Sequence, residues 1–87
     1  MIVGSRLEER ILVIVDVEDY RKRRIARIQD QAREVAERVA RTGREEELEP
    51  MNPFERKLVH DAAAEVGGVE TTSRGEEPER YVVIRTR

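Results

Sequence analysis

The residue pair that suggests a chemistry is Arg56 and His60, which lie four positions apart in the sequence. In an α-helix this spacing places both side chains on one face. A guanidinium and an imidazole together present several N–H donors, which is what the binding of phosphate groups or base edges requires. The alternative is that both are ordinary surface residues, and spacing alone leaves the two interpretations open.

Catalysis is a weaker interpretation of His60, the single histidine of the chain. Asp61 or Glu65 could serve as its acid–base partner, but Asp61 is adjacent in the sequence and points about 100° away around a helix. Neither Ser5 nor Ser73 has the signature of an activated nucleophile, and there is no Cys. The Glu-rich runs lack the alternating ligand spacing of a calcium loop. We therefore expect no enzyme activity, no metal and no cofactor.

A second feature is the basic run Arg21–Arg24, which is followed by Arg27. Residues 18–44 hold nine bases against five acids, whereas residues 45–55 hold five Glu and no base. The whole chain has a formal net charge of −2, so an anionic partner has to meet a local patch. Such a run can contact phosphates or form the solvated face of a helix, and charge alone leaves both open.

Length and composition limit the elements that could position these residues. The chain has 87 residues, of which 38% are hydrophobic and 3% aromatic, so we expect one small domain with a thin core. The absence of Cys is typical of a reducing compartment, and we expect a cytoplasmic protein. No run approaches the roughly 20 apolar residues of a membrane span, so we expect no membrane insertion.

The first half of the chain predicts a strand followed by a long helix. The apolar run Ile11–Val15 suits a strand covered on both faces. Its apolar character suggests a missing neighbour, either a second copy or a preceding domain. Asp16 is a good N-cap for a helix from Val17 that ends before Gly43. The apolar repeat of this helix consists of Ile25, Ile28, Ala32, Val35 and Val39.

The second half predicts a capped helix and a hairpin. Asn52 can cap a helix that starts at Pro53, with Glu55 completing a capping box, and a short strand is expected to end at Leu48. This helix should bury the stripe Phe54, Leu58, Ala62 and Val66, which leaves Arg56 and His60 exposed to solvent. Two strands, Val69–Arg74 and Arg80–Thr86, flank a polar turn and should form an antiparallel hairpin.

The ordered string Met51–His60, followed by Gly68–Thr71 and Ser73–Ile84, resembles a known family. It is similar to the R-three-H domain, named for its Arg-x-x-x-His motif, in the version found in bacterial Jag proteins, which are sporulation-protein-J-associated, KH-domain-containing RNA-binding proteins. The stretch Asp16–Arg24 resembles the junction at which a KH domain enters the R-three-H domain in that family. The resemblance covers residues 11–86, which is most of the chain.

The resemblance implies an α+β fold, a small antiparallel sheet of about three strands with two helices packed on it, the first of them long. It implies binding of single-stranded nucleic acid, usually RNA. Residues 1–17 would be a disordered start and the last strand of a missing KH domain, and residues 18–87 the R-three-H domain. Arg56 and His60 take the positions of the family motif, and the other expected contacts are Arg80, Lys57 and Arg74.

One departure from the family concerns the KH domain, because its Gly-x-x-Gly loop is absent. The chain is therefore expected to be a fragment of a longer protein. About three phosphate contacts predict a salt slope near −2, and a charged His60 predicts tighter binding at about pH 6 than at about pH 8. The alternative function is a dimerisation or partner-docking module, in which a homodimer forms through the first strand and the first helix.

Overall fold

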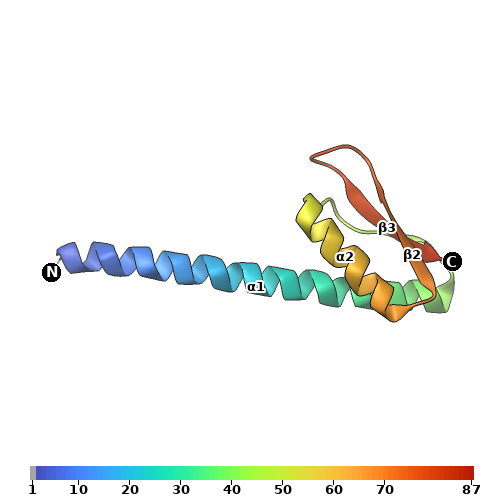
Figure 1. Cartoon of the computed structure of the whole chain (residues 1–87), viewed down its shortest axis with the longest axis horizontal. Helices are drawn as coiled ribbons and strands as arrows, with labels where there is room; N and C mark the ends of the chain where they lie inside the picture. Colours follow the sequence, from blue (N-terminus) through green and yellow to red (C-terminus); the bar gives the residue numbers. More distant parts are fainter. Residues whose placement is uncertain (1) are drawn as a thin grey trace.

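The computed structural model describes residues 2–87 of the chain, with side chains from residue 17 onward. Two helices and a three-stranded antiparallel sheet form the α+β arrangement that the sequence predicted (Figure 1). The elements in chain order are helix α1 (Ile2–Thr42), strand β1 (Glu46–Glu47), helix α2 (Pro53–Val66), strand β2 (Val69–Arg74) and strand β3 (Tyr81–Thr86).

The N-terminal part of α1 corrects two predictions. Residues 11–15 are helical and not a strand, and the helix does not begin after Asp16, because α1 runs from Ile2 through that position. No Gly or Pro occurs between Ser5 and Thr42, so no residue interrupts the helix. Each β-branched residue lowers the stability of a helix by only a few tenths of a kcal/mol, which is too little to end a helix that no Gly or Pro interrupts.

The C-terminal part of α1 carries the predicted apolar stripe. Ile28, Ala32, Val35 and Val39 are buried, and Ala36 joins them. The helix ends where predicted, because Gly43 adopts a φ of 75° and its N–H donates to the carbonyl oxygen of Val39 at 2.8 Å. Within the described part of the chain, neither helix is long and apolar enough to cross a membrane.

Helix α2 starts and ends as the sequence predicted but buries a different face. Asn52 accepts from the Glu55 N–H, and Glu55 returns the bond in a capping box. The buried residues are Arg56, Val59, Ala62 and Ala63, whereas Phe54 is 60% exposed. The predicted core stripe is therefore wrong at Phe54, because α1 and the sheet meet α2 on the side of Val59.

The sheet completes the core, with strand order β1-β3-β2. The predicted hairpin is confirmed: β2 and β3 pair antiparallel from Val69 opposite Thr86 to Arg74 opposite Tyr81. Strand β3 begins at Tyr81, one residue later than predicted. Its central position buries Val82 and Ile84 completely against the apolar stripes of the two helices. Figure 1 shows α2 and the hairpin gathered at the C-terminal end of α1.

Candidate nucleic-acid interface

Arg56 is a buried tie between α2 and the loop that joins β2 to β3. Only 8% of its surface is exposed. Its Nη1 donates to the carbonyl oxygen of Met51 at 2.7 Å, and its Nη2 donates to Oε1 of Glu77 at 2.5 Å. The expectation that Arg56 meets solvent is therefore wrong. The guanidinium therefore joins the β2–β3 loop to the start of α2.

His60 lies half-buried where α2 meets β2. Its Nδ1 is 2.5 Å from Oγ1 of Thr71, and its Nε2 is 3.2 Å from Oγ of Ser73. In a neutral imidazole one ring nitrogen donates and the other accepts, and both roles suit hydroxyl partners. His60 and these two hydroxyl groups form a continuous polar strip, which we call the α2–β2 seam.

The surroundings of His60 favour its neutral form. Burial lowers the pKa of His60 below its usual 6.5, and the positive charge of Arg56 lowers it further, against an opposite effect of Asp61. A charged His60 at pH 6 was the basis for expecting tighter binding there. This shift argues for a neutral donor and acceptor instead.

The other three expected contacts lie nearby, each with a partner within the protein. Lys57 is 75% exposed, and its Nζ is 3.8 Å from Oδ2 of Asp61. Arg74 Nη2 donates to Oε1 of Glu45 at 3.2 Å, and Arg80 Nη1 donates to the carbonyl oxygen of Gly75 at 2.7 Å. Exposed ion pairs of this kind contribute about 0–1 kcal/mol, so a phosphate can replace either carboxylate.

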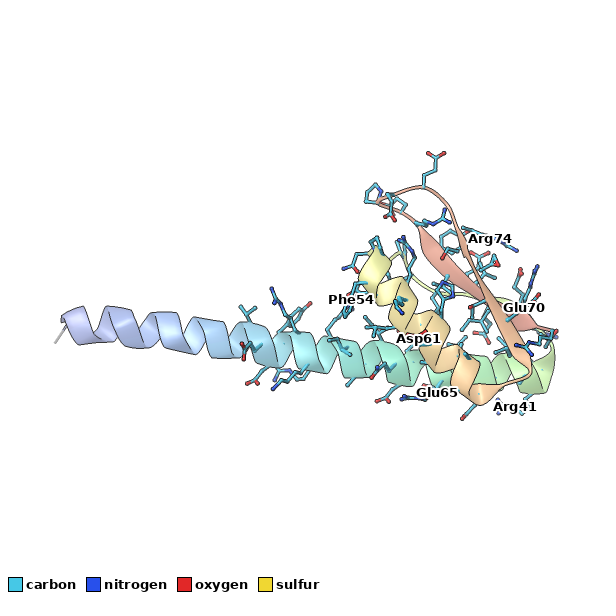
Figure 2. All side chains as sticks on the ribbon, in the orientation of Figure 1. Arg41, Phe54, Asp61, Glu65, Glu70 and Arg74 are labelled. Atoms are coloured by element: carbon cyan, nitrogen blue, oxygen red, sulfur yellow. The ribbon has the colours of Figure 1, made fainter. Side chains whose placement is uncertain are left out.

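The structure thus divides the five predicted residues into two groups. Lys57 and His60 follow one side of α2, whereas Arg74 and Arg80 lie at the loop end of the hairpin (Figure 2 labels Arg74). The loop between them also carries the exposed acids Glu76, Glu77 and Glu79, which reduce the positive potential of the hairpin end. We therefore expect no more than two phosphate contacts there, from Arg74 and Arg80.

Sequence reasoning missed three residues that shape this surface, namely Thr71, Ser73 and Glu77. Side chains alternate between the two faces of a strand, so Thr71 and Ser73 lie on one face. The predicted hairpin could therefore have identified both residues. Glu77 lies in a turn of consecutive acids, where no local pattern distinguishes the one that meets Arg56. Only the tertiary arrangement could identify it.

The basic run on α1 behaves differently from these residues. Arg24 donates its Nε to Oε2 of Glu55 at 3.0 Å and approaches Glu49 at 3.9 Å. Its exposed basic neighbours have no ion-pair partner among the side chains that the structure describes, and they are Arg21, Lys22, Arg23 and Arg27. This stretch is the part of the described surface where bases most clearly outnumber acids.

Comparisons with known proteins agree with this geometry. The family profile of the R-three-H domain matches residues 26–86. The chain is 42% identical to the RNA-binding protein KhpB of Clostridium symbiosum over 84 residues, which is 97% of this chain. It is 44% identical over 75 residues to the protein of that name from Lactiplantibacillus plantarum, and 36% identical over 74 residues to that of Bacillus subtilis.

These relatives are longer than the chain. The chain spans 38% of the Clostridium symbiosum protein, 23% of the Lactiplantibacillus plantarum protein and 36% of the Bacillus subtilis protein. The matches confirm the resemblance drawn from the motif around Arg56 and His60, and they point to a binding protein rather than an enzyme.

Proposed function

This chain belongs to the R-three-H domain family, and from that membership we propose that it binds single-stranded nucleic acid, with RNA as the target. The relatives that share its sequence are named RNA-binding proteins, which supports this choice. Because the chain spans less than two fifths of each, we assign the binding to residues 18–87 as an R-three-H domain and make no use of the relatives' remaining length. We place it in the cytoplasm and assign it no catalytic role.

The observation that carries the proposal is the position of the motif histidine. His60 lies beside Thr71 and Ser73, so the α2–β2 seam offers neutral donors and acceptors in a row. Such groups suit the edges of unpaired bases and sugar hydroxyls, which single-stranded RNA exposes. Lys57 stands one turn before His60 and is well exposed, so it can contact a phosphate of the same strand.

Arg56 has a positioning role in this proposal. Its two hydrogen bonds to Met51 and Glu77 leave few of its N–H donors for a ligand, but they hold the β2–β3 loop beside the seam. Arg74 and Arg80 then flank the seam from the hairpin. With Lys57 they give three phosphate contacts, for which the slope of log K against log salt is about −2 on a single strand.

The experiment is an anisotropy titration of a labelled single-stranded RNA at about 50 and 200 mM salt. The Lys57→Ala, Arg80→Ala double variant removes two of these three cations without touching the core, and its slope should be shallower than that of the wild type by about 1.4. Arg41→Ala is the matched control, because Arg41 is an exposed base in the last turn of α1. Its slope should equal that of the wild type.

Two results would count against the proposal. If the wild-type chain does not bind single-stranded RNA at the lower salt concentration, the function is wrong. If the double variant binds with the wild-type slope, the domain binds RNA but not through the seam and the hairpin bases. Sedimentation of the same samples tests the alternative, a dimerisation module, because that role predicts a dimer without RNA.

A further inference from the structure

A cleft between α1 and the start of α2 lies outside the α2–β2 seam. It has a volume of about 420 Å³ and is lined by Tyr20, Arg21, Arg24, Ile25, Phe54 and Glu55. Tyr20 and Phe54 are 62% and 60% exposed, although large apolar side chains are usually buried. Two exposed aromatic rings that line one cleft indicate a binding surface.

The walls of this cleft are fixed by contacts between the two helices. Arg24 of α1 donates to Oε2 of Glu55 at 3.0 Å, and the other carboxylate oxygen of Glu55 caps α2 at the Asn52 N–H. Ile25 beside them is half-buried. A cleft with walls held in this way needs little reordering when a ligand enters, which favours binding.

The charge around the cleft favours an anionic ligand. Residues 17–27 hold five bases against two acids. Arg21 lines the cleft, is exposed and has no ion-pair partner among the described side chains. An apolar partner helix would gain nothing from these cations, whereas a nucleic-acid strand carries a phosphate beside every base.

The cleft is also continuous with the seam along the surface of α2. Phe54, Lys57 and His60 follow each other at three-residue spacing, which makes them neighbours on a helix. Figure 2 shows Phe54 near the start of α2, on the side toward which the N-terminal part of α1 extends. Arg74 lies beyond α2 on the hairpin. A strand that contacts His60 can therefore reach Phe54 by passing Lys57.

We propose that the cleft is a base-stacking subsite, which takes one unpaired nucleobase against Tyr20 and Phe54 while Arg21 contacts the adjoining phosphate. The inference rests on the proposed binding of single-stranded nucleic acid and adds a second contact region to it. The volume falls in the range of about 300–1,000 Å³ that holds small ligands. Stacking accepts every base, so this subsite adds affinity without sequence preference.

The test compares Phe54→Leu with Phe54→Trp, using a labelled single-stranded oligouridylate of about 12 nucleotides. Leucine keeps an apolar side chain but has no aromatic face, so affinity should fall between about 5-fold and 100-fold. Tryptophan keeps the face, and its affinity should stay within about 2-fold of the wild type. Because Phe54 is exposed and outside the core, both variants should fold, which circular dichroism checks.

Phe54→Trp also gives a direct signal of stacking. The chain has no tryptophan, so with excitation beyond the absorption band of its two tyrosines the introduced indole is the sole source of emission. Binding of the oligouridylate should quench that emission, whereas an abasic strand of equal length should not. A second pair of variants tests the phosphate contact: Arg21→Ala should weaken binding, and Arg41→Ala should not.

The outcomes separate this inference from the proposed function. If the wild type binds RNA but Phe54→Leu binds equally well and Phe54→Trp is not quenched, the subsite is wrong and the function stands. If the wild type binds no RNA, the function fails and the subsite with it. If Phe54→Leu changes the sedimentation of the chain and leaves RNA affinity unchanged, the cleft is a contact between copies and the subsite is again wrong.

Discussion

Arg56 illustrates how a residue of a binding motif can act without an exposed side chain. Its guanidinium is held between the carbonyl oxygen of Met51 and the carboxylate of Glu77. Charge-assisted hydrogen bonds of this kind are stronger than neutral ones, and a buried arginine loses more when either partner is removed. The motif arginine therefore positions the loop beside the binding surface.

Replacing Arg56 should act mainly on the stability of the fold. Arg56→Ala removes two hydrogen bonds made by a buried side chain, and we expect the free energy of unfolding to fall by about 2 kcal/mol. Arg80→Ala is the control, since replacing this surface arginine should change stability by less than about 0.5 kcal/mol. Urea unfolding measures the free energy of unfolding of both variants. An Arg56→Ala chain as stable as the wild type would show that this tie does not form in solution.

His60 predicts the pH dependence of stability. Its folded pKa is lowered below the usual 6.5, so between the two values the unfolded chain binds more protons than the folded one. Stability should therefore be full above about pH 6.5 and fall as the pH drops through that window. The pKa of Glu46 is lowered from 4.5 by the hydrogen bond from Arg38, and its effect appears only at lower pH.

The measurement is urea unfolding at about pH 7.5 and about pH 5.5 for the wild type and His60→Gln. The wild type should be less stable at the lower pH, and the variant should show a smaller difference. A wild type that gains stability on acidification would mean that His60 is charged in the folded state. That result would restore the expectation of tighter RNA binding at low pH.

At the scale of elements, the sequence predicted what depends on local chemistry. The capping box at Asn52 and Glu55, the stop at Gly43 and the β2–β3 hairpin are each encoded by a few adjacent residues, and all three are confirmed. The start of α1 could not be placed in this way, because no stop signal separates Ile11–Val15 from the helix that follows.

The buried face of α2 shows a second limit of sequence reasoning. Two apolar stripes overlap on this helix, one through Phe54 and Leu58 and one through Val59 and Ala63. The two stripes differ in direction by about 140° around the axis. Only the packing of α1 and the sheet selects Val59, and this choice exposes Phe54 while it buries Arg56. The candidate residues could therefore be named from the sequence, but not their roles.

At the scale of the molecule, the chain is elongated, with extents of 61 × 25 × 15 Å. The core cluster draws on side chains from Ile28 to Ile84, and Figure 1 shows α1 continuing beyond the rest of the domain. Helical stability in proteins comes mostly from tertiary packing. The extended part of α1 should therefore contribute little to the stability of the domain.

Shortening the chain tests this expectation. A chain that starts at Val17 should keep its free energy of unfolding within about 1 kcal/mol of the full chain, because the described core remains intact. A chain that starts at Gln29 loses Ile28 and the Arg24–Glu55 ion pair, and it should lose at least about 2 kcal/mol. Urea unfolding compares the two. A large loss in the first variant would show that residues 1–16 pack on the domain.

Because α1 is one unbroken helix, it also fixes the orientation of its N-terminal end relative to the rest of the domain. From Ile2 to Arg27 the helix advances about 1.5 Å and turns about 100° per residue. Whatever is attached at its N-terminal end is held at a set distance and a set angle from the cleft and the seam. Inserting one residue into this stretch would swing the attached part about 100° around the axis, whereas inserting seven would move it outward and return it almost to its original heading.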